Sequence, residues 1–541
     1  MPERVEARVA PIVVVKTNVA ARSAVVEGSD PSLFSRYFVF GWQSISFDNP
    51  RSKLILLGLS VVGIAGVCVM VKRGTIAFPD WRRHLESPPN VQKPKLAELG
   101  RCKFGYQDVY DVESVVTGFG SYDWEQTHAP ATQTAVAIDS VIKAGAVSTG
   151  KQTMDDFGLS MFGRNWRDGP AENPVAPKHF SGGAASGSGV AVASNAVDFA
   201  LAIDSIGGVR IPAAFCGIFG YRASHGVIST AGVTAVAPSL DVVGVFSRDP
   251  YVLHQVVKVL LKQPELEWGS PAEVLIADDC FGLSTISSVR TADLLARAVS
   301  DTIGRSLIHH VNLGTHIASN VPTLRNFLME EERLLQQDTS RYSTYDGLRD
   351  AMILILREEF KEKHRKWFED VNPELAPDVD VRVKFAMAPH LDGLHRLALK
   401  VKDETRAAMN ELLLTDTLLV IPSTPSLPPS KAARGKELEF FESRALSILS
   451  IASMSGCCQV TVPIGDVRGI PISVSLMARC GGDLFLLDSL IKLNPKLQLE
   501  VDILKQKRSS MRDEHTSVRN SVLWEVSLPR RTSTRRPTKY Q

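Results

Sequence analysis

One turn of this chain brings together residue types that could do chemistry. It lies within DSIGGVRIPAAFCG, residues 204–217, where Asp204 and Arg210 place a carboxylate and a guanidinium six positions apart. Between them stands a Gly-Gly pair, and such a pair lets a tight turn present backbone N–H groups to an oxyanion or a phosphate. The residue after the glycines, however, is Val209 and not a nucleophile. The stretch therefore has the form of a catalytic loop that lacks its reactive side chain.

The turn belongs to a longer region, residues 181–232, whose composition indicates closely packed backbones. A Gly/Ser/Ala-rich loop leads into an apolar helix of small residues, GVAVASNAV, and a short strand, FALAI, precedes the turn. Small residues at this density allow a loop, a helix and a strand to approach one another closely. A buried site built from main chain requires such an approach.

Alternating elements on either side of this region must position it. From about residue 101 to 495, short β-rich runs alternate with helical patterns. The clearest runs are VLIADD (274–279), TLLVIPS (417–423) and CQVTVPIG (458–465), and the clearest helical patterns cover 324–337 and 387–415. This alternation predicts an α/β protein, with a sheet covered by helices.

Composition narrows the class of protein. The chain has 541 residues, 44% of them hydrophobic and 22% charged, which is typical of a globular protein with a large core. The formal net charge of +2 does not indicate nucleic acid as a partner. Seven cysteines, an odd number without a CxxC pair, argue against a disulfide framework and against a structural zinc site. We expect no metal site, no cofactor site and a reducing compartment.

The segment LILLGLSVVGIAGVCVMV, residues 54–71, contains no charged residue. As a helix it would be about 27 Å long, close to the hydrocarbon thickness of a bilayer. Arg51 and Lys53 precede it, and Lys72 and Arg73 follow it. The sequence therefore predicts one transmembrane anchor, and the positive-inside rule places the C-terminal bulk in the cytosol. A buried core helix and a cleaved signal peptide are the alternatives.

These features predict five parts of the chain. The parts are an N-terminal extension (1–53), the anchor (54–73), a stiff Pro-containing linker (74–100), the main domain (101–495) and a basic tail (496–541). From Lys505 onward the tail carries ten Lys and Arg residues against three Asp and Glu, with Ser, Thr and Pro between them. Such a composition is typical of a solvated, disordered segment.

Four stretches of the main domain resemble the amidase signature family in the order in which that family has them. They are KQTMDDFGLSMFGRN (151–165), SGGAASGSGVAVA (181–193), DSIGGVRIPAAFCGIFGYR (204–222) and SRALSILSIASMSGCCQVTVPIG (443–465). The resemblance runs from about Gly100 to Asp488. It implies the amidase signature fold, a large mixed β-sheet flanked by helices.

Active members of this family use a lysine, a bridging serine held by a cis peptide, and a nucleophilic serine. The resemblance places the nucleophile position at Gly208, the bridging position at Ala184 and the lysine position at Gln107. Glycine and alanine carry no hydroxyl, and a glutamine amide does not accept a proton near neutral pH. Loss of a whole serine-hydrolase triad costs on the order of 10⁶ in turnover. The resemblance therefore implies a pseudoenzyme.

Other residues near the loop are candidate substitutes for the missing groups or remnants of the site. Ser205, Ser186 and Ser188 carry hydroxyls, but none keeps its spacing to a base. The resemblance implies that the remnant of an oxyanion-binding loop consists of Ser205, Ile206 and Gly207. We expect Asp204 and Arg210 to hold that loop in place as a charge-assisted pair. The remaining candidates, which we interpret as structural or solvent-exposed, are Lys103, Cys216 and His225.

A closer likeness is to plant members of the family that carry an N-terminal anchor and contain a stretch similar to SLDVVGVFSRDP (239–250). It implies a non-catalytic receptor or docking component of organelle protein import. Membrane, translocon subunits and precursor proteins would be its partners, at the chloroplast outer envelope or, alternatively, the mitochondrial outer membrane. Plant members of this kind end in helical repeats that bind chaperones. Residues 496–541 carry none, so chaperone docking is not expected. We expect either a truncated or alternatively spliced form, or a paralogue with another role. The competing hypothesis is an active membrane-bound amidase or fatty acid amide hydrolase.

Overall fold

The computed structural model describes residues 98–262, 270–286, 288–335, 339, 342–389 and 391–514. All of them belong to one compact unit that spans Pro94–Gln541. The predicted extension, the anchor at 54–73, most of the linker and the end of the tail lie outside the described residues. Among the helices that are described, none combines the length and the apolar character needed to cross a bilayer.

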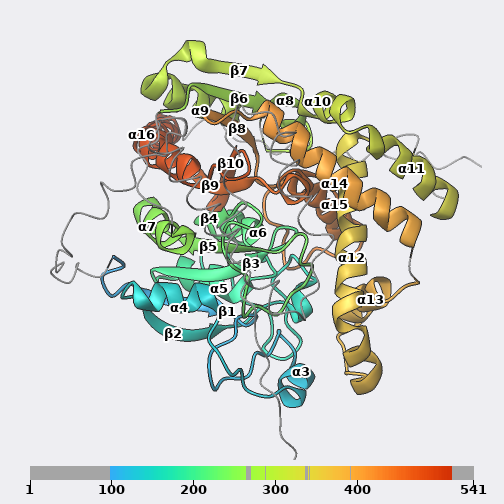
Figure 1. Ribbon diagram of the computed structural model, residues 1–541. Coiled ribbons are helices and arrows are strands. Elements are labelled where there is room, and N and C mark those ends of the chain that lie inside the picture. Colours follow the sequence, from blue (N-terminus) through green and yellow to red (C-terminus); the bar gives the residue numbers. More distant parts are fainter. Residues whose placement is uncertain are drawn as a thin grey trace, which may run out of the picture. The chain divides into compact units, whose positions relative to one another are not determined.

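A ten-stranded mixed sheet organises this unit, in the order β2-β1-β3-β5-β4-β9-β10-β8-β6-β7. Figure 1 shows the strands stacked in that order, with β2 at the bottom and β7 at the top. The strands are β1 (Lys103–Gln107), β2 (Val147–Gln152), β3 (Phe199–Asp204), β4 (Phe219–Arg222), β5 (Val242–Ser247), β6 (Glu273–Ala277), β7 (Ile308–Val311), β8 (Thr417–Pro422), β9 (Cys458–Val467) and β10 (Ile470–Ala478). The predicted α/β class and mixed sheet are confirmed.

Both ends of the sheet are parallel and its middle is antiparallel. β1 pairs in parallel with β2 and β3, and β6 pairs in parallel with β7 and β8. The strands between them pair antiparallel, including β3 with β5 and β9 with β10. Every residue of β3, β5 and β8 is buried. Strands buried on both faces read as continuous apolar runs, which is why these segments could be recognised in the sequence.

Helices cover the sheet on both faces, and three of them form the wall of the candidate site. The helices are α3 (Tyr122–Thr127), α4 (Val136–Lys143), α5 (Ser186–Ala193), α6 (Arg210–Cys216), α7 (Pro250–Leu261), α8 (Asp278–Phe281), α9 (Ser288–Ile303), α10 (Leu313–Asn320), α11 (Pro322–Leu335), α12 (Thr344–Val371), α13 (Pro377–Ala386), α14 (Asp392–Leu412), α15 (Lys436–Ser455) and α16 (Asp483–Glu514). The predicted helices at 324–337 and 387–415 correspond to α11 and α14. Helix α12, drawn in yellow, runs along one side of the stacked strands (Figure 1).

Helix α12 was not predicted, although it is 28 residues long. Its apolar residues are interrupted by many charged ones, so its hydrophobic periodicity is weak. A capping box starts it, because the Ser343 side chain accepts from the backbone N–H of Asp346 and the Asp346 carboxylate accepts from that of Ser343. Asn372 ends it in a left-handed conformation.

Helical structure continues past residue 495, the predicted boundary between domain and tail. Helix α16 runs from Asp483 to Glu514, through Pro495. Leu497 and Val501 lie beyond that proline and are 3% exposed each, in the main hydrophobic core. Burial of these side chains keeps the segment helical although a proline removes one backbone hydrogen bond.

Candidate functional site

A cavity of about 460 Å³ lies where the ends of β1 and β3 meet helices α12, α13 and α15. The three predicted triad positions, Gln107, Ala184 and Gly208, all line it. The predicted loop residues Ser205, Ile206 and Gly207 line it too. Positions that are far apart in the sequence thus converge on one cavity.

Gln107 ends β1 and is 2% exposed. Its Oε1 accepts a hydrogen bond of 2.9 Å from the backbone N–H of Ile203. The parallel pairing of β1 with β3 extends only as far as Tyr106 and Leu201, so the glutamine side chain continues it past the last backbone pair. Its Nε2 lies 3.7 Å from the sulfur of Met154. Gln107 therefore acts here as a structural hydrogen-bonding group.

Ala184 lies in the Gly-rich loop that precedes α5, and it is 7% exposed. The peptide bond between Gly183 and Ala184 is cis. The carbonyl of Ala184 accepts a hydrogen bond of 2.9 Å from the backbone N–H of Asp155, and Gly183 donates one of 3.0 Å to Met161. These bonds hold the loop against residues 155–161.

Gly208 has no room for a side chain. A Cβ atom built on it would lie 2.6 Å from the carbonyl oxygen of Ile203 and 3.8 Å from the backbone nitrogen of Ala184. The two positions to which the resemblance assigns the bridging and the nucleophilic serine are thus neighbours, and the Ile203 carbonyl oxygen lies too close to Gly208 to admit a Cβ atom. The left-handed conformation of the turn falls on Gly207, with φ of 127°, and not on Gly208.

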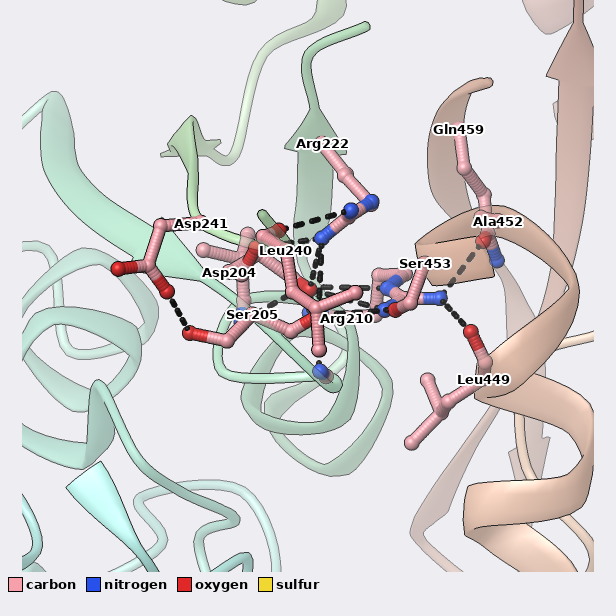
Figure 2. A network of polar contacts seen from close by, with 12 residues as sticks. Asp204, Ser205, Arg210, Arg222, Leu240, Asp241, Leu449, Ala452, Ser453 and Gln459 are labelled. Carbon is pink, nitrogen blue, oxygen red and sulfur yellow. Dashed lines mark hydrogen bonds and ion pairs between the residues drawn. The ribbon is translucent and has the colours of Figure 1, made fainter. Parts of the chain in front are cut away.

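Asp204 organises the turn, as Figure 2 shows. Its carboxylate accepts hydrogen bonds of 3.0 to 3.2 Å from the backbone N–H groups of Gly207, Val209 and Arg210. It also pairs with two buried guanidinium groups, Arg210 Nη2 at 2.9 Å and Arg222 Nη1 at 2.8 Å. All three charged side chains are completely buried.

The same network joins the turn to α15 and β9. Arg210 Nη1 donates to the carbonyl oxygen of Leu449 at 2.9 Å and to Oε1 of Gln459 at 3.1 Å, and its Nη2 donates to the Ser453 hydroxyl at 2.9 Å. Burial by itself would raise the pKa of Asp204, but the two guanidinium groups hold it below its usual range. Burial lowers the pKa of Arg222 to about 10. The Asp204 carboxylate and the Arg222 guanidinium are therefore both charged near neutral pH.

The loop residues that line the cavity differ in the hydrogen bonds they can offer. The N–H of Gly207 already donates to Asp204. Within the described part of the chain, the N–H groups of Ile206 and Gly208 donate to no protein acceptor. The Ser205 hydroxyl donates to Oδ1 of Asp241 at 2.5 Å. Burial raises the pKa of Asp241.

The remaining candidate residues lie away from the cavity wall. Ser186 and Ser188 are buried in α5 and do not line the cavity. Lys103 starts β1 at its exposed end. His225 bonds to the carbonyl of Pro238 through Nε2 at 3.0 Å. Cys216 donates to the carbonyl of Ser181 at 3.4 Å, and burial raises the pKa of its thiol to about 12.

Asp155, which the sequence did not single out, is fully buried beneath the Gly-rich loop. Its Oδ2 accepts from the N–H of Gly163 at 3.0 Å and would lie 2.0 Å from a Cβ built on Gly183. Burial raises the pKa of Asp155 to about 8, although hydrogen bonds from Ser186 and Ser160 oppose the change. Asp155 stands in KQTMDDFG, well before the Gly-rich loop in the sequence, and only the fold brings the two together. No local sequence pattern therefore marked Asp155 as part of the site.

The helical wall adds three arginines that sequence reasoning also missed. Arg349 and Arg357 come from α12 and Arg382 from α13. Each forms an ion pair with a carboxylate. Arg349 pairs with Asp346 at 2.9 Å, Arg357 with Glu358 at 2.6 Å, and Arg382 with Glu442 at 2.6 Å. The other wall residues are largely apolar, among them Ile353, Leu356, Phe385 and Leu446. Because these charges are paired, the cavity suits a neutral, mostly apolar molecule.

No group of three or more His, Cys, Asp or Glu side chains in the described part of the chain is placed to hold a metal ion. The observed groups around the cavity can therefore bind and orient a molecule through backbone N–H groups and apolar contacts. None of Gln107, Ala184 and Gly208 supplies a nucleophile or a base.

Comparison with known proteins identifies the family of this chain. The Amidase family model matches residues 104–275. The chain is 40% identical to "Outer envelope protein 64, chloroplastic" of Arabidopsis thaliana, over 84% of this chain and 77% of that protein. It is 37% identical to "Translocon at the outer membrane of chloroplasts 64" of Pisum sativum, over 86% and 78%. It is 41% identical to "Amidase 1" of Arabidopsis thaliana, over 74% and 92%.

The fold is similar to that of a solved amidase, with a TM-score of 0.60 and 21% identity over 73% of this chain and 84% of that one. At this level of identity the structure supports the fold alone. The curated relatives, at about 40% identity over most of their length, extend the agreement to the sequence. The chain therefore belongs to the amidase signature family.

Proposed function

We propose that this protein is a non-catalytic, membrane-anchored amidase-like component of protein import at the chloroplast outer envelope. Its amidase domain would face the cytosol and act as a receptor or docking platform for precursor proteins and translocon subunits. The residues at the three triad positions carry this proposal: a glutamine, an alanine and a glycine line the cavity where a lysine and two serines would have to stand.

Two structural details support a loss of chemistry that a single change would not reverse. The Gln107 side chain accepts a hydrogen bond from the backbone N–H of Ile203, so it stabilises the sheet. Gly208 faces the carbonyl of Ile203 at a distance that excludes a Cβ atom. A hydrolase needs a nucleophile, a base and an orienting group within hydrogen-bond reach of one another.

The names of the relatives support the import role. Two of them are named for the chloroplast outer envelope and its translocon, and these are similar to this chain over more than four fifths of its length. Another relative is named "Outer envelope protein 64, mitochondrial", so the mitochondrial outer membrane is the alternative location.

The second candidate function is an active amidase that cleaves carbon–nitrogen amide bonds. The similarity to Amidase 1 and the presence of a cavity favour it. The Ser205 hydroxyl, which lies in that cavity and donates to Asp241, would be its nucleophile. This candidate lacks a lysine at Gln107 and a bridging hydroxyl at Ala184.

Two measurements test the proposal. The full-length protein, tagged at its C-terminus, should be found at the chloroplast surface in a plant cell and should cross-link to a precursor arrested during import. A serine-reactive fluorophosphonate probe should leave the purified protein unlabelled, with Amidase 1 as the positive control. Labelling at Ser205 together with turnover of a simple amide would replace the proposal by the second candidate. Location at another membrane without precursor cross-links would refute the import role.

A further inference from the structure

Helix α13 forms a part of the cavity wall that also faces solvent. Four of its residues line the cavity, namely Val381, Arg382, Phe385 and Ala386. Val381 is 66% exposed and Phe385 is 53% exposed, although both residues line the cavity. The helix therefore stands between this part of the cavity and the surrounding water.

Short segments without regular structure join α13 to the rest of the domain. The helix spans only Pro377–Ala386, and residues 372–376 before it and 387–389 after it belong to no helix or strand. The second segment is tied to α12, because Lys361 Nζ donates to the carbonyl oxygen of Ala388. Segments of this kind can absorb the changes in φ and ψ that let a short helix move.

The apolar face that holds α13 in place is small. Helix α13 packs chiefly against α12, beside which it lies in Figure 1. The buried side chains of the helix are valines and alanines, such as Val379, Val383 and Ala386. Arg357 of α12 lies over the ring of Phe385, 5.6 Å from its centre. Small side chains bury little apolar area, so polar contacts can contribute a substantial share of the free energy that holds α13 against the domain.

Arg382 connects α13 to two other parts of the cavity wall. Its Nη1 lies 2.6 Å from Oε1 of Glu442 on α15, and its Nη2 lies 3.1 Å from Oε2 of the same carboxylate. Nη1 also donates to the carbonyl oxygen of Leu159 at 3.0 Å. All three residues line the cavity. A guanidinium that pairs with both oxygens of a carboxylate fixes their relative orientation and is stronger than a single hydrogen bond.

We propose that α13 is a lid over the cavity and that the Arg382–Glu442 ion pair holds this lid closed. When the pair separates, α13 moves away from α15 on its two flanking segments and opens the cavity to the neutral, mostly apolar molecule that the walls suit. Local openings of this size occur without unfolding of the domain. The lid controls access to the cavity, so the proposal does not depend on which of the two candidate functions holds.

A second ion pair on α13 provides a matched control. Lys384 Nζ lies 2.7 Å from Oδ2 of Asp380, one turn away on the same helix. Neither of these residues lines the cavity. Lys384→Gln therefore removes a positive charge from α13, as Arg382→Gln does, but leaves the contact between α13 and α15 intact.

Hydrogen–deuterium exchange of the full-length protein, followed by mass spectrometry, tests the ion pair. Arg382→Gln and Glu442→Gln each break it, so either change should raise the exchange rate of residues 377–386 at least about threefold. The double variant should exchange no faster than the single ones, because the second change removes nothing further. Lys384→Gln should exchange at the wild-type rate. Residues 401–409 of α14 should be unaffected in every variant.

An uncharged fluorophore tests access to the cavity. N-phenyl-1-naphthylamine emits more strongly in apolar surroundings, so stopped-flow fluorescence follows its entry and release. Arg382→Gln and Glu442→Gln should increase both rates by a similar factor and change the Kd little, because a lid governs passage and not the fit of the bound molecule. Ile353→Trp, which places a larger side chain in the cavity, should abolish binding and so identify the binding site of the probe.

Equal exchange rates of residues 377–386 in Arg382→Gln and Lys384→Gln would overturn the role of the ion pair. So would faster exchange spread evenly over α12, α13 and α14, since the pair would then support the whole domain. A probe that enters the Arg382→Gln and Glu442→Gln variants no faster than the wild type, or that binds none of these proteins, would overturn the lid.

Discussion

The Oε1 atom of Gln107 lies 2.9 Å from the backbone nitrogen of Ile203, two residues past the point where β1 and β3 stop pairing. The resemblance to active amidases places a catalytic lysine at this position. In this protein the side chain satisfies a strand N–H group in the interior instead. The Gln107 side chain thus extends the pairing between β1 and β3.

We expect Gln107→Lys to destabilise the protein. The lysine offers no acceptor to the N–H of Ile203 and introduces an amine at a site that is 2% exposed. The loss of an acceptor from a buried donor costs about 1–3 kcal/mol in the free energy of unfolding. Urea denaturation of the purified protein measures this. Lys103→Gln, at the exposed end of the same strand, is the control and should unfold at the wild-type midpoint.

Gly208→Ser should lower the melting temperature and restore no activity. The added Cβ would lie 2.6 Å from the Ile203 carbonyl oxygen, so the turn must shift to admit it. Gly393→Ser is the control, because a Cβ built on Gly393 meets nothing within 4 Å. Equal melting temperatures for the two variants would show that the turn at Gly208 is not constrained. Thermal unfolding followed by circular dichroism is the measurement.

Reversion of the whole relay should be strongly non-additive. Ala184→Ser alone restores only the bridging hydroxyl, and Gln107→Lys alone restores only the base. Neither variant contains a nucleophilic serine, so no single variant should react with a fluorophosphonate probe. Only the triple variant that also carries Gly208→Ser contains nucleophile, bridge and base, and members of a catalytic relay act as a unit. We expect labelling in the triple variant alone, at a rate limited by the closed turn. Labelling of one single variant would contradict this interpretation.

Asp155 should make stability depend on pH between about 4 and 8. Burial raises its folded pKa to about 8, above the unfolded value near 3.8, so its stabilising contribution is complete below about 4 and is lost as the pH rises through 8. Each unit of difference corresponds to about 1.4 kcal/mol at most. Asp155→Asn should flatten the plot of unfolding free energy against pH. Asp139→Asn, on the exposed face of α4, should leave that slope as it is in the wild type.

The anchor predicted at residues 54–71 remains a prediction, because it lies outside the described residues. An uncharged segment of this length with basic flanks is costly to keep in water. The full-length protein should stay in the membrane pellet after carbonate extraction, and removal of residues 1–73 should release the domain into the supernatant. Extraction of the intact protein by carbonate would show that the segment does not span a membrane.

Much of the scaffold could be predicted because its signals are local. The buried strands β6 and β8 are continuous apolar runs, and α11 and α14 carry a clear helical period. Helix α12 was not predicted because buried charged residues, Arg357 and Glu358 among them, interrupt its hydrophobic periodicity. The end of α16 was not predicted, because the burial of Leu497 and Val501 that supports the helix beyond Pro495 depends on packing against distant segments.

The sequence by itself determined the α/β class, the family motifs and the residue types at the three positions that the resemblance singles out, since all of these depend on identity and spacing along the chain. Only the tertiary structure decided what those residues do. Gln107 meets Ile203 from 96 residues away, and the helices α12 and α13 bring paired arginines to the cavity. The closed turn at Gly208 depends on the position of the Ile203 carbonyl. Such contacts arise from the packing of distant segments, which no local pattern of residues encodes.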